Sequence, residues 1–170
     1  PLVMDKIAAA RRFGLPVDGH APGLRGKDAK QYASAGITTD HECTTLQEAL
    51  DKINAGMHIL IREGSAAKNY NALHTLIGTR PDRVMLCSDD KHPDDLVRGH
   101  INQLVTRSLE LGYDLMDVLN IACVNPVKHY NLNVGLLQPG DPADMIMIED
   151  PESFNVMSTW LNGDEVYAGE

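Results

Sequence analysis

The feature that most constrains the fold is a short apolar run that occurs four times, each time followed by polar residues and then by a helical pattern. The polar residues begin at His20, His41, Arg62 and Asp89, at intervals of 21, 21 and 27 residues. One βα unit of a parallel α/β protein takes about this much chain. The spacing therefore predicts a parallel sheet whose strands end in polar residues at one common edge.

The expected strands are short apolar runs, whereas the expected helices repeat apolar residues every three to four positions and stop at a glycine such as Gly14, Gly36 or Gly56. Before the third helix, Thr44 or Thr45 is suited to accept a hydrogen bond from the first helical turn. We expect strands at 15–19, 37–40, 57–61 and 83–87, and helices at 2–13, 26–35, 44–55, 69–77, 94–111, 114–122 and 125–130.

Polar residues at the C-terminal edge of parallel strands are typical of a (β/α)8 barrel, whose active site lies at that edge. Four units make half of such a barrel, so the other four strands would lie upstream or come from another chain. The tail is β-rich, with a strand at 145–148 and a hairpin that turns at Asn162-Gly163. We expect a half-barrel at 1–132, a β-rich segment at 133–170, and a longer parent chain.

The composition narrows the choice of partners. The 170 residues carry 24 acidic and 15 basic side chains, and the net charge of −9 argues against a nucleic-acid or anionic-membrane partner, either of which favours a basic face. The three cysteines stand far apart, so no disulfide framework is indicated, and we expect a reducing, cytoplasmic location. No apolar stretch has the length of a membrane span.

Histidine, histidine and aspartate at three strand ends form a candidate metal site. Imidazole and carboxylate together suit zinc, iron or manganese, so we expect His20, His41 and Asp89 to converge on a divalent ion. Such an ion brings the pKa of its water near neutrality, and a carboxylate can move the released proton. Taken singly, the two histidines are better explained as turn residues, and Asp89-Asp90 as a helix start. Their recurrence at one edge of a regular βα array favours the site.

Arg62 and Glu63 follow the third expected strand and fit two interpretations. They can form an ion pair with each other. Alternatively, they can hydrogen-bond a planar polar substrate, because the guanidinium donates in a fork and the carboxylate accepts.

Five segments carry a specific resemblance. GHAPGL at 19–24, TDHECTTLQEAL at 39–50, IREGSAAKN at 61–69 and LCSDD at 86–90 occur in order, followed by VGLLQPGDPADMIMIED at 134–150. Together they resemble the C-terminal part of the bacterial-type adenine deaminases, a family of the amidohydrolase superfamily. The resemblance extends over nearly the whole chain. The last segment is the least specific, because metal-dependent amidohydrolases in general share it.

The resemblance implies a (β/α)8 barrel, of which this chain would form strands five to eight, and a small composite β-sandwich built from both chain ends. It implies hydrolysis of adenine to hypoxanthine and ammonia, a reaction of purine salvage, in which an activated hydroxide attacks C6. The metal centre would hold manganese or iron, with zinc as an alternative, and would be binuclear in the complete protein.

The motif residues can be matched one by one. His20 and His41 would be the metal ligands after strands five and six. Asp89 would be the aspartate after strand eight that touches metal and shuttles the proton, with Asp90 as its adjacent rival. The other matched positions near the purine are Glu42, expected to take part in catalysis, and Arg62, Glu63, Ser65 and Asp90, expected to bind substrate.

Two features of the family are absent from this sequence. The His-x-His pair that the family carries after strand one occurs nowhere in the 170 residues, and the acidic residue after strand four is missing too. We therefore expect the chain alone to be inactive. Two alternatives stay open: a related amidohydrolase acting on a cyclic amide or another amino-heterocycle, or a non-catalytic fragment that associates with partner chains. Half a barrel exposes strand edges and apolar surface, so we expect a homo-oligomer.

Overall fold

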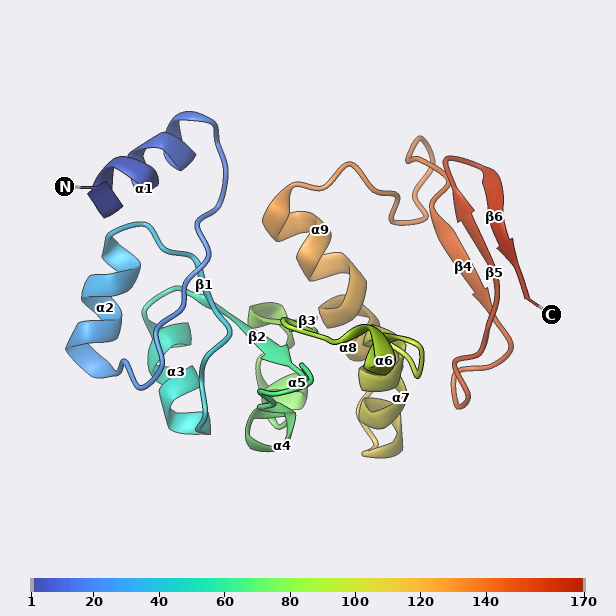
Figure 1. The fold of residues 1–170 in the computed structure, drawn as a ribbon, viewed down its shortest axis with the longest axis horizontal. Coiled ribbons are helices and arrows are strands. Elements are labelled where there is room, and N and C mark those ends of the chain that lie inside the picture. Colours follow the sequence, from blue (N-terminus) through green and yellow to red (C-terminus); the bar gives the residue numbers. More distant parts are fainter. Residues whose placement is uncertain (1, 170) are drawn as a thin grey trace.

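A computed structural model describes residues 2–169 and contains two sheets connected by helices (Figure 1). A parallel sheet with the strand order β1-β2-β3 lies near the middle of the molecule, and an antiparallel sheet with the order β4-β5-β6 lies at its C-terminal end. The strands are β1 (Thr39–Asp40), β2 (His58–Arg62), β3 (Val84–Cys87), β4 (Met145–Ile148), β5 (Val156–Leu161) and β6 (Asp164–Ala168).

Helices separate the parallel strands, as the sequence predicts. Among the described residues, no helix combines the length and the apolar composition needed to cross a membrane. The helices are α1 (Leu2–Arg12), α2 (Gly26–Ser34), α3 (Leu46–Asn54), α4 (Tyr70–Leu73), α5 (Leu76–Thr79), the 3-10 turn η1 (Pro81–Arg83), α6 (Pro93–Leu96), α7 (Ile101–Glu110), α8 (Leu115–Leu119), the π-helical turn η2 (Asn120–Val124) and α9 (Asn125–Tyr130).

The register of the parallel sheet places the C-terminal strand ends side by side. Thr39 of β1 pairs with His58 of β2, and Arg62 at the end of β2 pairs with Cys87 at the end of β3. The polar residues that follow each strand therefore start from neighbouring positions, which confirms the common edge expected from the spacing.

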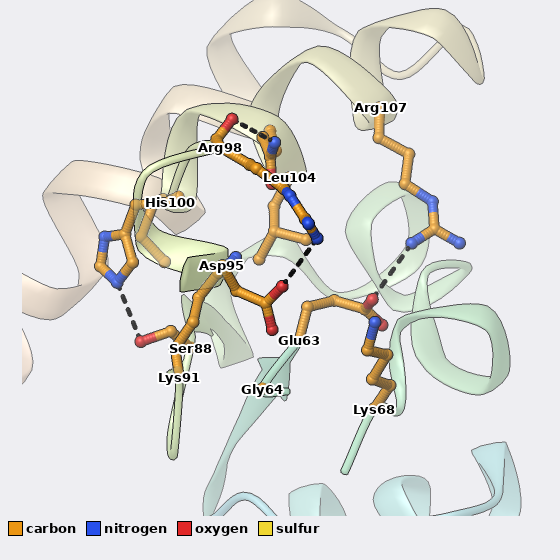
Figure 2. A pocket seen from close by; sticks show the side chains of 12 residues that line it. Glu63, Gly64, Lys68, Ser88, Lys91, Asp95, Arg98, His100, Leu104 and Arg107 are labelled. Atoms are coloured by element: carbon orange, nitrogen blue, oxygen red, sulfur yellow. Dashed lines mark hydrogen bonds and ion pairs between the residues drawn. The ribbon is translucent and has the colours of Figure 1, made fainter. Parts of the chain in front are cut away.

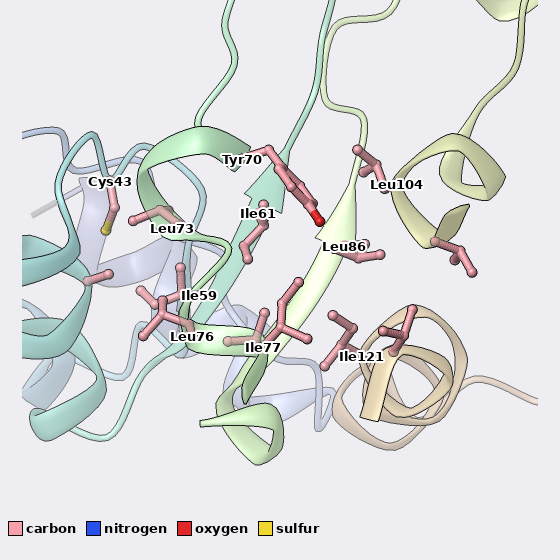
Figure 3. Packing of buried hydrophobic residues seen from close by; sticks show 14 of the residues in the cluster. Cys43, Ile59, Ile61, Tyr70, Leu73, Leu76, Ile77, Leu86, Leu104 and Ile121 are labelled. Atoms are coloured by element: carbon pink, nitrogen blue, oxygen red, sulfur yellow. The ribbon is translucent and has the colours of Figure 1, made fainter. Parts of the chain in front are cut away.

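The hydrophobic core lies between the parallel sheet and the helices that follow its strands (Figure 3). Ile59 and Ile61 of β2 are fully buried, whereas His58 and Leu60 on the opposite face are partly exposed. This alternation follows from the strand geometry, because successive side chains point to opposite faces. Each fully buried aliphatic side chain stabilises the fold by about 1.5–3 kcal/mol. Other members of this core are Tyr70, Leu73, Leu76, Ile77, Leu86, Leu104 and Ile121.

The expected strand at 15–19 is extended but does not form a ladder. One backbone hydrogen bond, of 2.9 Å from the Thr38 N–H to the Val17 carbonyl, joins it to the segment that leads into β1. Pro16 has no N–H to donate, which shortens any ladder here. Gly19 lies so close to β1 that a Cβ atom would stand 2.3 Å from the Thr39 carbonyl oxygen. The segment therefore packs against β1 without pairing as a strand.

Two expected helices are each divided into two in the structure. In place of 69–77 the chain forms α4 and α5, and in place of 94–111 it forms α6 and α7. The second break lies at Gly99, whose φ of +140° does not fit a right-handed helix. The N–H of the next residue, His100, donates to the Asn102 side chain at 2.8 Å, which helps α7 to begin there.

Other helix ends agree with the sequence. Thr45 accepts a hydrogen bond of 3.3 Å from the Glu48 N–H, which identifies it as the N-cap of α3. Beyond α8, Pro126 lacks the N–H that a regular helix needs, and the chain passes through the π-helical turn before α9. Asn125 beside it donates to the Val84 carbonyl at 2.8 Å and so fixes this turn against the start of β3.

The tail forms the expected hairpin. Asn162 and Gly163 both have positive φ, of 51° and 89°, as the two central residues of a type I′ turn require. Strands β5 and β6 pair antiparallel across this turn, and β4 pairs with the other edge of β5. Several apolar side chains of this sheet are exposed. The division of the chain at residue 133 stays a prediction.

Candidate active site

The candidate site lies at the shared C-terminal edge of the parallel strands. His20 follows the extended segment before α2, and His41 and Glu42 follow β1 directly. Arg62 is the last residue of β2, and Asp89 lies two residues beyond the end of β3. The fold therefore brings to one edge five residues that the sequence analysis singled out.

His20, His41 and Glu42 converge on one carboxylate oxygen. Nδ1 of His20 lies 3.4 Å from Oε1 of Glu42, and Nε2 of His41 lies 3.3 Å from the same atom. One ligand atom from each of the three residues lies within 4.8 Å of the others. The His20 side chain is 68% exposed but that of Glu42 only 12%, so the group opens to solvent on the His20 side.

Glu42 Oε1 is a buried polar atom that accepts no hydrogen bond of regular geometry from residues 2–169, although Nη2 of Arg62 lies 2.8 Å from it in an ion pair. The neighbouring oxygen, Oε2, accepts a hydrogen bond of 2.9 Å from Nη2 of Arg62. Buried carboxylate oxygens normally have hydrogen-bond partners. Apart from this ion pair, a carboxylate oxygen that faces two imidazole nitrogens is the donor arrangement that a divalent ion of the zinc, iron or manganese type accepts.

Asp89 joins the same edge through Arg62 and not through the histidines. Nη1 of Arg62 is in direct contact with Oδ2 of Asp89. Asp89 has a φ of +53°, a left-handed conformation that aspartate tolerates better than most residues. The structure thus brings His20 and His41 together, as expected, but their carboxylate neighbour is Glu42, and Asp89 lies one side chain further away.

Glu63 points away from this group. Adjacent residues at a strand end project to opposite faces, so Glu63 leaves on the side opposite to Arg62. Its Oε2 lies 3.6 Å from Nη1 of Arg107 on α7, and its Oε1 accepts a hydrogen bond from the Tyr70 N–H at 3.3 Å. The ion pairs of Arg62 and Glu63 are therefore formed with other partners, not with each other.

Ser65 and Asp90 fix the loops beside the site. The Ser65 N–H donates to the Asp90 carbonyl at 2.9 Å. The Ser65 hydroxyl donates to Asp95 and accepts from the His92 N–H at 2.8 Å. In this arrangement the side chain of Ser65 connects the loop after β2 to the loop after β3.

A cavity of about 280 Å³ lies on the Glu63 side of the same edge (Figure 2). Its walls carry Arg98, paired with Asp95 at 3.3 Å, and Arg107, which reaches Glu63. The residues that converge on Glu42 do not line it. The two carboxylates of this cavity, Glu63 and Asp95, are already paired with arginines, so the convergent group around Glu42 remains the stronger candidate site.

Sequence reasoning did not find one further group, formed by Asp40, Cys43 and Glu48. One ligand atom of each lies within 4.8 Å of the others, and all three residues are buried. The space between the carboxylates is occupied by Nζ of Lys52, which donates to both. Lys52 on the buried face of an amphipathic helix was the available signal, because lysine is almost never fully buried unless it is paired.

The comparison with known proteins identifies the family. Residues 2–166 match the profile of the Amidohydrolase family. The chain belongs to the amidohydrolase family. Within this family it is 58% identical over 163 residues to the adenine deaminase of Salinibacter ruber, covering 96% of this chain and 30% of that protein. It is 54% identical over 168 residues to that of Methanosarcina mazei, covering 98% and 30%. The chain thus spans about 30% of the length of these amidohydrolases, and the expected resemblance is confirmed.

Two solved structures confirm the mixed α/β architecture. The β-aspartyl dipeptidase of Fervidobacterium islandicum AW-1 superposes with a TM-score of 0.68 at 21% identity, covering 90% of this chain and 46% of that one. The N-acetylglucosamine-6-phosphate deacetylase of Pasteurella multocida gives a TM-score of 0.63 at 15% identity, covering 84% and 48%. At these identities the likeness establishes the fold only.

Proposed function

We propose that the protein containing this chain is an adenine deaminase, which hydrolyses adenine to hypoxanthine and ammonia. The observation that carries the proposal is the group formed by His20, His41 and Glu42 at the strand ends of a chain 58% identical to an adenine deaminase. The chain would supply strands five to eight of a (β/α)8 barrel, with the extended segment at 15–19 as strand five. The β4-β5-β6 sheet would be its share of a composite β-sandwich.

The residues present fit a divalent metal ion. His20 and His41 would hold it through ring nitrogens, and Glu42 Oε1 is the buried oxygen nearest to both. When bound, the ion makes hydroxide available from water near neutral pH. Manganese or iron, and a second ion held with residues outside this chain, are expectations from the resemblance. Asp89, held at the same edge by Arg62, is the third ligand that the resemblance implies.

Arg62 orients the two carboxylates of the site. It donates to Glu42 and contacts Asp89, so one guanidinium holds both carboxylates at one edge. The side chain of Asp89 would take the proton of the attacking water and deliver it to the amino group that leaves C6 as ammonia. A direct contact of Arg62 with the edge of the purine stays a prediction from the resemblance. For Glu63, Ser65 and Asp90, contact with substrate stays a prediction, as do the cytoplasmic location and the homo-oligomer.

Substrate turnover by the full-length protein tests this proposal. Adenine should release ammonia and hypoxanthine, whereas dihydroorotate and hydantoins, which would be substrates of a related amidohydrolase, should not turn over. Asp89→Asn should lower kcat by about 10²–10⁴-fold, the usual contribution of a general acid–base group. Asp94→Asn, which changes an exposed aspartate on the same segment, is the matched control and should keep kcat near the parental value. Turnover of a cyclic amide in place of adenine, or parental kcat in Asp89→Asn, would refute the assignment.

A further inference from the structure

A fully buried charge cluster lies directly beneath the candidate site. It consists of Lys52 and Asp40, which are both 0% exposed, and Glu48, which is 2% exposed. Nζ of Lys52 donates to Oδ2 of Asp40 at 2.9 Å and to Oε1 of Glu48 at 2.9 Å. Its third donor reaches the carbonyl of Ala21, next to His20, at 2.6 Å.

The same cluster binds the backbone of the segment that carries His20. Oδ1 of Asp40 accepts from the Ala21 N–H at 2.8 Å. Oε1 of Glu48 accepts from the Gly23 N–H at 2.7 Å. Together with the bond from Lys52 to the Ala21 carbonyl, three hydrogen bonds hold the chain immediately after His20.

The cluster also binds the segment that carries His41. Oδ2 of Asp40 accepts from the Glu42 N–H at 3.0 Å, and Oε2 of Glu48 accepts from the Thr44 N–H at 3.1 Å. The loop after β1 is therefore held at both of its ends by the same two carboxylates that hold the loop after His20.

Stability alone does not account for such a cluster. Taking three charges out of water is costly, and well-packed apolar residues of similar volume are often at least as stabilising. Burial by itself lowers the pKa of Lys52, but its hydrogen bonds to Glu48 and Asp40 outweigh this and raise it, so the ammonium stays charged. What apolar residues could not supply is directional hydrogen bonds to two separate loops.

We propose that Lys52, with Asp40 and Glu48, is a positioning device that fixes His20 relative to His41 and Glu42 and thereby sets the affinity of the site for its divalent ion. This inference rests on the proposed function, because it takes the group around Glu42 as the metal site. The side chains of Lys52 and Glu48 touch no substrate in this account. They act through the backbone on which the ligands stand.

The test is Mn²⁺ affinity of the full-length protein, measured by competition with a chelator on the folded fraction. Lys52→Met keeps the length of the side chain but removes all three donors. Glu48→Gln keeps the shape of the side chain and leaves the Lys52–Asp40 pair intact. Its amide NH₂ group, however, would replace the oxygen that accepts from the backbone N–H of either Gly23 or Thr44. We expect Mn²⁺ affinity to fall by about 10–100-fold in each variant, the usual effect of losing a group that orients metal ligands.

The matched control is Asp51→Asn. Asp51 is the neighbour of Lys52 on α3 and joins the same loop through Arg25, at 3.1 Å, but this ion pair is exposed. A merely structural role predicts that all three variants lower the melting temperature and keep the parental Mn²⁺ affinity when folded. That result would overturn the inference. If Lys52→Met does not fold, Glu48→Gln decides. A parental protein that binds no Mn²⁺ would refute the proposed function instead.

Discussion

Arg62 at the end of β2 and Glu42 beyond the end of β1 form the central contact of the site: Nη2 of Arg62 lies 2.8 Å from Oε1 of Glu42 and donates a hydrogen bond of 2.9 Å to its Oε2. The other guanidinium nitrogen contacts Asp89 beyond β3. One side chain therefore sets the separation of two carboxylates that the chain delivers from two different strands.

Replacing Arg62 with lysine should separate these carboxylates. A lysine is a point charge that cannot bind both acids with a fixed fork. We expect kcat/KM for adenine to fall by about 10²-fold in Arg62→Lys of the full-length protein, the effect of a small misplacement of catalytic groups. Arg107→Lys, which disturbs contacts with Glu63, Asn71 and Tyr70 but none with Glu42 or Asp89, is the control for steady-state kinetics. Equal kinetics in the two variants would show that the fork of Arg62 is not needed.

We expect the fold to require a residue without a side chain at Gly19. A Cβ at this position would meet the Thr39 carbonyl oxygen at 2.3 Å, and backbone cannot move aside cheaply. Overpacking of this kind costs about 1–3 kcal/mol, so Gly19→Ala should lower the free energy of unfolding by that amount, measured with urea. Gly23→Ala serves as the control. Gly23 has open space around it and a φ of +73°, so its substitution tests backbone strain alone.

If the two glycine variants lose the same stability, the close approach between the 15–19 segment and β1 does not matter for folding. A larger loss in Gly19→Ala would instead support the position of this segment as the neighbour of β1.

The sequence predicted the order and the edge of the parallel strands because both follow from local patterns. The third and fourth apolar runs end close to Arg62 and Asp89, and the register of the parallel sheet aligns the ends of these two strands. A strand was expected at 15–19, but this segment forms no ladder, because Pro16 lacks one of the N–H donors that strand pairing needs. The break at Gly99 was missed because isolated glycines also occur inside helices.

The site was predicted less completely than the fold. His20 and His41 were found because they recur at strand ends. The neighbour relation between Asp89 and Arg62 depends on side-chain directions, which no spacing pattern contains. The role of Lys52 was missed because lysine is mostly exposed, so its place on the buried face of α3, the available signal, was given no weight.

The histidine pair on the opposite end of the sheet should make stability depend on pH. The rings of His58 and His129 lie 4.7 Å apart. Burial lowers the pKa of both, and for His58 the proximity of His129 and of Arg83 lowers it further, with Asp82 acting in the opposite direction. The folded state therefore favours neutral rings.

The direction in which stability changes with pH follows from these lowered pKa values. The stabilisation that the two neutral rings give to the folded state is complete above the ordinary histidine pKa of 6.5. It is lost as the pH falls below 6.5 and passes through the lower pKa values of the folded protein. We expect the melting temperature to fall between pH 7.5 and 5.5, and to fall less in His129→Asn. The exposed His92→Asn is the control. An unchanged pH slope in His129→Asn would exclude the pair as its source.

The central claim is that His20 and His41 are metal ligands, and the metal content of the full-length protein tests it most directly. The protein should be purified with Mn²⁺ supplied, and the number of ions per chain should be measured by elemental analysis for the parent, His20→Ala, His41→Ala and the loop control His92→Ala. The account predicts that each of the first two variants, still folded by circular dichroism, loses at least one ion per chain, while His92→Ala keeps the parental number. An unchanged metal content in His20→Ala and His41→Ala would contradict it.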